Sequence, residues 1–211
     1  LVVGGGPAGV CAAVAAAREG VKVMIVETAN FLGGMATRSL VGPFMTCFDA
    51  AGEQMIIKGL FEEIVDRMVA KGGAIHPKDV RATTPYSAWI TAGHDHCTPF
   101  EPECMKLVLD EMVEEAGIKV LFHTDFIEPI LKGGRITGAV ISNKAGLQMV
   151  DAKVVIDCTG DGDVAYRSGV PCHFGNENGK PQPSTAFFHI NNVDSKKLEA
   201  DVQKHLHEFR K

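Results

Sequence analysis

The sequence predicts an α/β fold: a parallel sheet with helices on both faces, a small antiparallel meander, and part of a second domain. Three observations predict it. One apolar run leads into the glycine-rich segment 4–9 and a helix-like stretch, a second ends at Glu27, and a third ends in the acidic segment 157–163. Such apolar runs are typical of buried parallel strands. The 211 residues can bury a substantial core as one or two domains.

The glycine-rich segment lies between the apolar run 1–3 and an alanine-rich stretch, 10–18, that is expected to be helical. Gly4 permits a tight turn, Gly6 lets a pyrophosphate approach the backbone, and Gly9 lets the helix pack on the strand. The N–H groups that open the helix favour phosphate. A structural glycine turn is the alternative. The predicted nucleotide-binding residues of this segment are Gly4, Gly6, Pro7, Ala8 and Gly9.

The next predicted strand, residues 21–26, is almost wholly apolar and ends at Glu27. A carboxylate there can accept hydrogen bonds from ribose hydroxyls, about 20 residues beyond the glycines as in dinucleotide sites. An acid at this position disfavours a 2′-phosphate and therefore NADP. The glycine pattern and the acid alone do not separate NAD from FAD.

Two further segments, Phe31-Leu-Gly-Gly-Met-Ala-Thr37 and Asp157-Cys-Thr-Gly-Asp-Gly-Asp163, resemble those of FAD-dependent oxidoreductases of the glutathione-reductase-like superfamily. The closest resemblance is to the group called FAD dependent oxidoreductase. It implies a Rossmann-like FAD-binding fold with FAD as the cofactor, the glycine pair beside the pyrophosphate and flavin, and the later strand end near the first glycine turn. The cofactor-binding residues it implies here are Thr28, Gly33, Gly34, Met35, Ala36, Thr37, Thr159, Gly160, Asp161 and Asp163.

The same segments have other interpretations from their residues alone. Gly33 and Gly34 are also compatible with a flexible surface loop. Asp157, Asp161 and Asp163 are oxygen donors that suit Ca²⁺, although the EF-hand spacing with its distal glutamate is absent. We expect no metal site here.

Two amphipathic helices are expected at residues 58–71 and 102–116, each followed by glycine. Between them, the polar stretch 76–100 contains three prolines and is the best candidate for a variable substrate-side loop.

A strand at residues 118–123 leads to Phe126, whose backbone the resemblance places against the adenine edge. Residues 130–141 carry a hairpin signal with a glycine pair at the reversal. With a further strand at 150–156, the segment 127–156 is predicted to form the antiparallel meander.

We expect residues 1–170 to form an FAD-binding domain with a helical and loop insertion at about 40–104. Residues 171–211, with a strand at 184–190 and a helix at 193–211, would begin a substrate domain. The chain opens inside its first strand without methionine. It is therefore expected to be a portion of a longer enzyme.

The composition limits the classes of molecule that this protein is expected to bind. The net charge of -5 gives no basic footprint for nucleic acid or an anionic membrane surface. No apolar stretch reaches the roughly 18 residues that a spanning helix needs. We expect a small-molecule substrate and a cytoplasmic location, with a homo-oligomer or a redox partner protein left open.

The sequence offers several catalytic candidates, and each also has a structural interpretation. Arg38 can stabilise a reduced flavin or a substrate carboxylate, or it is simply a surface arginine. Cys47 follows the glycine pair closely enough for a redox role, or it is a packed thiol. His94 and His96 suit a metal, an acid–base role or a polar loop, and His189 is a further acid–base candidate. The six cysteines contain no C-x-x-C pair, which disfavours zinc and a dithiol centre.

The favoured function is an FAD-dependent oxidoreductase that transfers hydride or electrons between a small-molecule substrate and bound FAD. One alternative is a flavoprotein electron-transfer subunit. The other is an NAD-using enzyme resembling thiazole synthases, in which an internal cysteine or histidine takes part.

Overall fold

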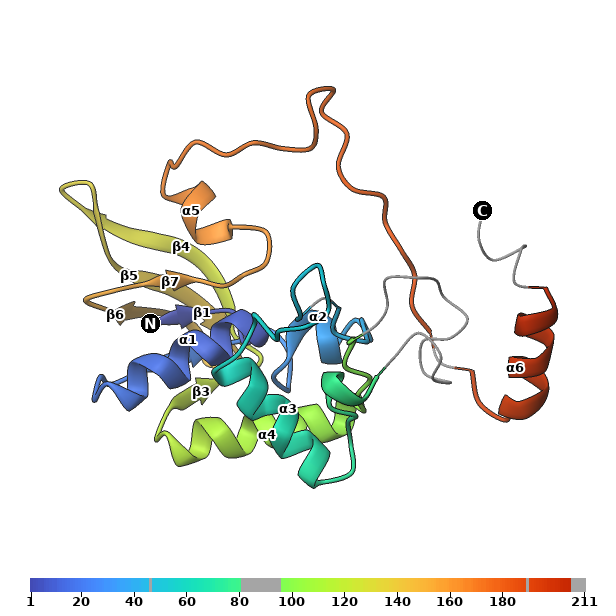
Figure 1. The fold of residues 1–211 in the computed structure, drawn as a ribbon. Helices are drawn as coiled ribbons and strands as arrows, with labels where there is room; N and C mark the ends of the chain where they lie inside the picture. The colour runs from blue at the N-terminus through green and yellow to red at the C-terminus, as the bar shows by residue number, and fades with distance from the viewer. Residues whose placement is uncertain (46, 81–95, 189, 206–211) are drawn as a thin grey trace. The chain divides into compact units, whose positions relative to one another are not determined.

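The computed structural model describes residues 1–45, 47–80, 96–188 and 190–205 and divides them into two compact units. Unit 1 contains Leu1–Ser39 and Lys106–Ala186, and unit 2 contains Leu40–Met105 and Phe187–Lys211. Figure 1 traces the chain by colour. Each unit is described separately below.

Unit 1 is built on a four-stranded parallel sheet in the order β3-β2-β1-β7. Its strands are β1 (Val2–Val3), β2 (Met24–Val26), β3 (Lys119–Leu121) and β7 (Ile156–Asp157). The predicted α/β fold is confirmed. The strand expected at 21–26 is shorter than predicted because the backbone N–H of Val21 donates to Ala16 O and so belongs to the end of the preceding helix.

Helix α1 (Pro7–Arg18) packs on β1, β2 and β7 of this sheet (Figure 1). Its buried face contains Gly9, Val10, Ala13 and Val14. The helix begins at Pro7, earlier than predicted, because proline suits the first helical position, where no N–H is needed.

The antiparallel meander consists of β4 (Asp125–Lys132), β5 (Arg135–Asn143) and β6 (Gly146–Asp151) (Figure 1). Ala139 and Ile141 of β5 are buried together with Val26 of β2, so the meander covers part of the parallel sheet.

The prediction of a single strand at 150–156 is wrong. Val150 pairs with Ala139 in the meander, whereas Ile156 pairs with Val2 in the parallel sheet. The N–H of Ala152 still bonds to Thr137 O, and the chain then crosses to the other sheet.

Three more helices belong wholly or partly to unit 1: α2 (Gly34–Thr37), α4 (Pro102–Glu115) and α5 (Asp163–Arg167). The predicted helix at 102–116 is confirmed as α4, which begins in unit 2 and continues into unit 1. Its apolar positions Val108, Leu109 and Met112 are buried, as the helical spacing predicted.

Unit 2 contains α3 (Leu60–Ala70), the short 3₁₀ helix η1 (Pro77–Asp79) and α6 (Ser195–Lys204). The predicted helix at 58–71 is confirmed as α3. Isolated bridges join Phe44 to Thr98 and Ala74 to Phe100, and the Phe44 and Phe100 rings stack with centroids 4.5 Å apart.

The predictions for the C-terminal segment and the substrate-side loop have mixed outcomes. Residues 184–188 and 190 form no strand, contrary to the strand expected at 184–190. The helix expected at 193–211 is α6 over its described part. Residues 81–95, within the predicted substrate-side loop, lie outside the described residues, as does His189.

Candidate nucleotide site

Unit 1 contains a cavity of about 610 Å³ at the carboxyl ends of β1, β2 and β7. In open α/β sheets ligands bind at this edge. The predicted residues that line it are Gly4, Gly6, Pro7, Ala8, Glu27, Thr28, Gly34, Met35, Arg38, Phe126, Thr159, Gly160 and Asp163. The lining residues that were not predicted are Val3, Val26, Ser39, Thr124, Asp125, Cys158 and Arg167.

The first glycine turn forms one wall of the cavity. Gly4 has a φ of 101°, and its N–H donates to Val26 O at 2.8 Å. Gly9 does not line the cavity. A Cβ on Gly9 would collide with the carbonyl oxygen of Gly4, so Gly9 contributes the close packing of helix on strand.

The N-terminus of α1 opens toward this cavity through Gly6, Pro7 and Ala8. Gly6 is the N-cap, no side chain caps the helix, and its first turn contains no acidic residue. An added Cβ on Gly6 would have only Gly34 Cα near it, at 3.9 Å. An uncapped helix N-terminus beside open space fits a diphosphate.

Glu27 is 7% exposed, and both of its carboxylate oxygens are held by the backbone. Oε2 accepts from Gly5 N at 2.6 Å, and Oε1 accepts from Ala29 N at 2.7 Å. Oε1 also accepts from the Thr28 hydroxyl at 3.2 Å, so the remaining lone-pair capacity is on Oε2. The carboxylate is therefore fixed in one orientation at the cavity wall and can still accept from a ribose hydroxyl.

Helix α2 brings the second glycine pair against the first glycine turn. The N–H of Gly33 donates to Gly5 O at 2.9 Å, and a Cβ on Gly34 would lie 2.9 Å from Gly6 Cα. Gly34 and Met35 line the cavity, whereas Gly33, Ala36 and Thr37 do not.

Ala36 and Thr37 are instead buried beneath the turn. Thr37 Oγ1 donates to Leu32 O at 2.8 Å, which fixes the loop that precedes α2. These two small residues support the cavity wall through packing rather than by facing the cavity.

Arg38 follows α2 and is exposed at the cavity rim. Its Nη1 donates to Thr28 Oγ1 at 3.1 Å. Arg38 forms no ion pair with any residue that the structure describes, so its charge is available to an anion.

The turn from β7 to α5 is organised by Asp157. Its Oδ1 accepts from the backbone N–H and the hydroxyl of Thr159, at 3.1 and 2.8 Å, and its Oδ2 accepts from Ala165 N at 2.9 Å. Partial burial raises the pKa of Asp157, but the hydrogen bonds that the carboxylate accepts together outweigh burial and hold its pKa below the ordinary value. Thr159, Gly160 and Asp163 line the cavity, but Asp161 does not.

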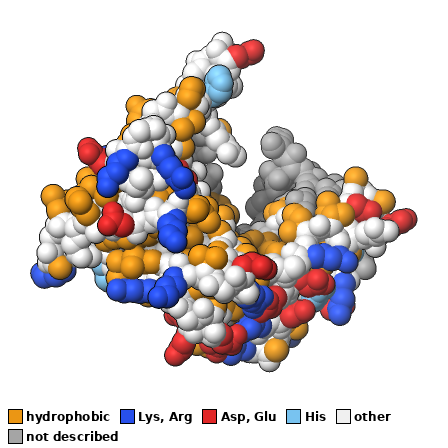
Figure 2. All heavy atoms as spheres, turned by 90° about the vertical axis from the view of Figure 1, so that its left-hand side faces the viewer, with side chains coloured by type: hydrophobic (Ala, Val, Ile, Leu, Met, Phe, Trp, Pro, Cys, Tyr) orange, Lys and Arg blue, Asp and Glu red, His pale blue; other side chains and the backbone are white. Residues whose placement is uncertain are grey.

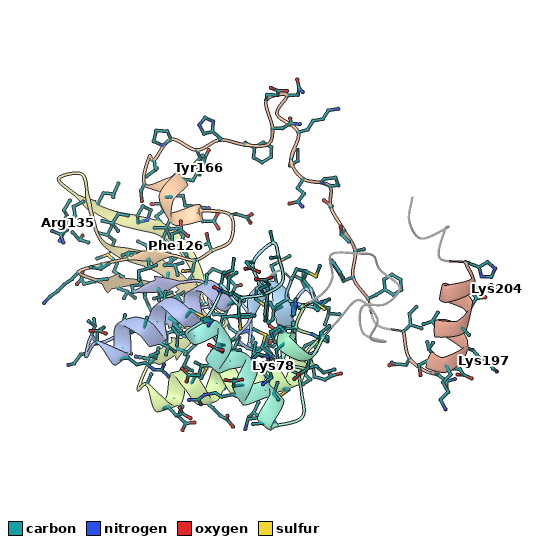
Figure 3. The ribbon with its side chains drawn as sticks, in the orientation of Figure 1. Lys78, Phe126, Arg135, Tyr166, Lys197 and Lys204 are labelled. Atoms are coloured by element: carbon teal, nitrogen blue, oxygen red, sulfur yellow. The ribbon has the colours of Figure 1, made fainter. Side chains whose placement is uncertain are left out.

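Phe126 lines the cavity from the first residues of β4 and is labelled in Figure 3. The preceding Thr124 donates its N–H to Glu27 O at 3.0 Å. This bond places the start of β4 next to the end of β2, so Phe126 and Glu27 border the same end of the cavity.

Cys47 and His96 form a buried cluster in unit 2. The Cys47 thiol donates to His96 O at 3.2 Å, and burial raises the pKa of this thiol. His96 stacks on Phe48, with centroids 3.9 Å apart, and its Nδ1 lies 3.0 Å from Pro77 O. These contacts hold both side chains inside the fold. His94 lies outside the described residues.

Comparison with known proteins identifies one family along the whole chain. A family model described as "FAD dependent oxidoreductase" matches residues 1–211. A thiamine thiazole synthase from Methanococcus aeolicus is 30% identical over 175 residues, covering 78% of this chain and 56% of that protein. A digeranylgeranylglycerophospholipid reductase from Methanosphaerula palustris is 26% identical over 182 residues, covering 76% and 38%.

A solved structure has a similar fold. The crystal structure of THI4 from Thermovibrio ammonificans superposes with a TM-score of 0.52 at 22% identity, covering 79% of this chain and 59% of that one. This chain spans 38–56% of the length of the two curated relatives.

Proposed function

Because this chain belongs to the FAD dependent oxidoreductase family, with FAD as its cofactor, we propose that the cavity of unit 1 is the FAD site. The enzyme transfers hydride or electrons between a small-molecule substrate and the flavin. The observation that carries this proposal is the uncapped N-terminus of α1, which opens into a cavity whose wall also holds the fixed carboxylate of Glu27.

Each part of the cavity suits one part of the cofactor. The α1 N-terminus would hold the diphosphate, and Glu27 would accept from the ribose of the adenosine half. The backbone at Phe126 would meet the adenine edge. Gly34 and Met35, with Thr159 and neighbouring residues of the β7–α5 turn, would border the ribityl chain and flavin.

Bound FAD supplies the hydride and electron chemistry, and the protein supplies orientation and charge. Arg38, held by Thr28 at the rim, would donate to the reduced flavin or to a carboxylate of the substrate.

We also infer the superfamily of this chain and the boundaries of its domains. The order of strand, glycine turn, helix and meander supports membership of the glutathione-reductase-like superfamily. Residues 1–170, interrupted at about 40–104, would form the FAD-binding domain, and residues 171–211 would begin a substrate domain. The grouping of residues 40–105 outside unit 1 supports the insertion, whereas unit 1 continues to Ala186, beyond the proposed boundary at residue 170.

The proposed setting is the cytoplasm, with a small molecule as substrate and either a second copy or a redox protein as partner. No helix within the described residues is both long enough and apolar enough to span a bilayer. Figure 2 presents a face on which acidic, basic and hydrophobic side chains are mixed.

A second candidate is a thiazole-synthase-like enzyme that consumes NAD, favoured by the 30% identity to the thiazole synthase. It would need a reactive cysteine or histidine. Cys47 is 1% exposed, with a raised thiol pKa. Because the thiolate is the nucleophile, this environment disfavours Cys47 in that role.

The deciding experiment is an absorption spectrum of the full-length protein before and after dithionite, with the heat-released ligand identified by mass spectrometry. We expect a flavin spectrum that bleaches reversibly, and released FAD. A colourless protein that releases NAD or an adenylated product would contradict the proposal and support the second candidate.

A further inference from the structure

Arg167, at the end of α5, lines the cavity although neither the glycine motifs nor the family resemblance points to it. Its Nη1 donates to the backbone oxygen of Ile127 in β4 at 2.6 Å. The guanidinium therefore contacts β4 at the residue after Phe126, and Phe126 and Glu27 line the same cavity. Figure 3 labels Phe126 on β4 and Tyr166, the neighbour of Arg167, on α5.

The backbone of α5 is fixed before any ligand arrives. Asp157 Oδ2 accepts from Ala165 N, and the N–H of Asp163 donates to Thr159 Oγ1 at 2.9 Å. These bonds tie the start of the helix to the turn after β7 and its middle to Asp157 of β7. Arg167 thus extends from an anchored helix and is restrained again at its tip by Ile127, so little of its freedom remains to be lost on binding.

Among the described residues Arg167 forms no ion pair, and its guanidinium contacts only the neutral carbonyl oxygen of Ile127. An arginine has five N–H donors and a planar face that stacks on aromatic rings. One donor is used by Ile127. The remaining donors and the face are available to a planar base or to a phosphate.

We propose that Arg167 binds the AMP half of FAD and makes the site prefer FAD over FMN, which lacks that half. This inference rests on the proposed function, since it requires FAD in the cavity. It deepens that function by assigning a residue that selects the dinucleotide.

The test measures binding of FAD and of FMN to the apoprotein by calorimetry, for the full-length wild type and for Arg167→Ala. We expect Arg167→Ala to weaken FAD binding about tenfold, because a cation–π or charge-assisted contact with the AMP half would be lost. FMN binding should be unchanged. Arg167→Lys keeps a donor for Ile127 but loses the planar fork, and we expect a loss of about threefold.

Arg135→Ala is the matched control. Arg135 is also an exposed arginine that donates to one backbone oxygen, that of Lys153 at 3.4 Å, but it lies on β5 and lines a different cavity (Figure 3). Its removal should leave FAD binding unchanged. Thermal unfolding of each apoprotein separates a folding defect from a binding defect.

Two results would overturn the inference while leaving the FAD site intact: wild-type FAD affinity in both Arg167 variants, or equal losses for FAD and FMN. The second result would mean that Arg167 only ties α5 to β4. A wild-type protein that binds neither flavin would overturn the proposed function itself, so the two failures are distinguishable.

Discussion

The turn from β1 to α1 and the turn from β7 to α5 meet at one edge of the parallel sheet but satisfy their backbones differently. The first has Gly6 as N-cap and receives no side-chain cap. The second is filled by Asp157, which accepts from Thr159 and from Ala165 inside the α5 helix. Cys158 N donates to Val3 O at 2.8 Å, so the two turns are also joined directly.

The difference shows that two strand-to-helix turns beside one cavity can contribute different groups to it. The first turn presents backbone N–H groups and the positive end of a 12-residue helix. In the second turn the N–H groups of Thr159, Asp163 and Ala165 are already bonded to side chains of this segment, and Arg167 of the following helix also lines the cavity. Substitutions at Gly6 in the first turn should therefore act on ligand binding, and substitutions at Asp157 in the second should act first on stability.

The largest effect is expected when a side chain is added at Gly6, in the β1–α1 turn. Gly6 has φ and ψ of -68° and -179°, which any residue can adopt, so Gly6→Val should fold. Its side chain would occupy the space expected for the diphosphate. We expect FAD binding to weaken about 100-fold, or about 2.8 kcal/mol, measured by calorimetry on the apoprotein.

Gly6→Ala provides the graded control, with a smaller loss. An apoprotein of Gly6→Val that unfolds at the wild-type temperature and binds FAD with wild-type affinity would contradict the assignment of the diphosphate to this turn.

The second-largest effect is expected when the carboxylate of Asp157 is removed from the β7–α5 turn. Asp157→Asn can still accept from Thr159, but its NH₂ group cannot accept from Ala165 N. We expect a loss of about 2 kcal/mol in the free energy of unfolding, as for one hydrogen bond to a charged group. Urea denaturation of the apoprotein measures it. Asp151→Asn, at an exposed position on β6, is the control and should change stability little.

The same turn should give a pH dependence with a defined sign. The pKa of Asp157 is lower in the folded protein than in the unfolded chain. Its stabilisation is then complete above the unfolded pKa, near 3.9 for aspartate, and is lost as pH falls through the lowered folded value. The stability difference between wild type and Asp157→Asn should shrink below about pH 4. A constant difference down to pH 2 would contradict this account.

The smallest effect concerns Cys158, which lines the cavity between the two turns. Burial and then the charge of Asp157 raise the pKa of its thiol. Alkylation by iodoacetamide should be slow at neutral pH, speed up as pH rises, and slow by a factor of a few when FAD is added. Peptide mass spectrometry measures it, with the exposed Cys172 as internal reference. Equal rates with and without FAD would contradict the position of the cofactor.

The sequence predicted the framework well where periodicity and glycine spacing act locally. Helices α1, α3 and α4 follow from apolar spacing, and the β4–β5 reversal follows from its glycine pair, with φ of 56° and 77°. The strand expected at 150–156 failed because an apolar run does not reveal which sheet it joins. Only pairing with Ala139 or with Val2 decides that.

The cavity was predicted where residues are adjacent in sequence and missed where they meet through the fold. Thr124 lies at the cavity only because its N–H bonds to Glu27 O, and no local pattern encodes that contact. Arg167 is the same case, since its place depends on Ile127, 40 residues earlier. Conversely, Gly33 and Thr37 belong to the predicted motif but serve packing.

The two backbone bonds of Glu27 limit how this protein could change its nucleotide during evolution. Replacing Glu27 with a small or basic residue, as one route toward a 2′-phosphorylated nucleotide, would also leave Gly5 N and Ala29 N without their acceptors. A new specificity would therefore first pass through a less stable intermediate. The path to such a change is expected to begin with compensating substitutions elsewhere in the turn.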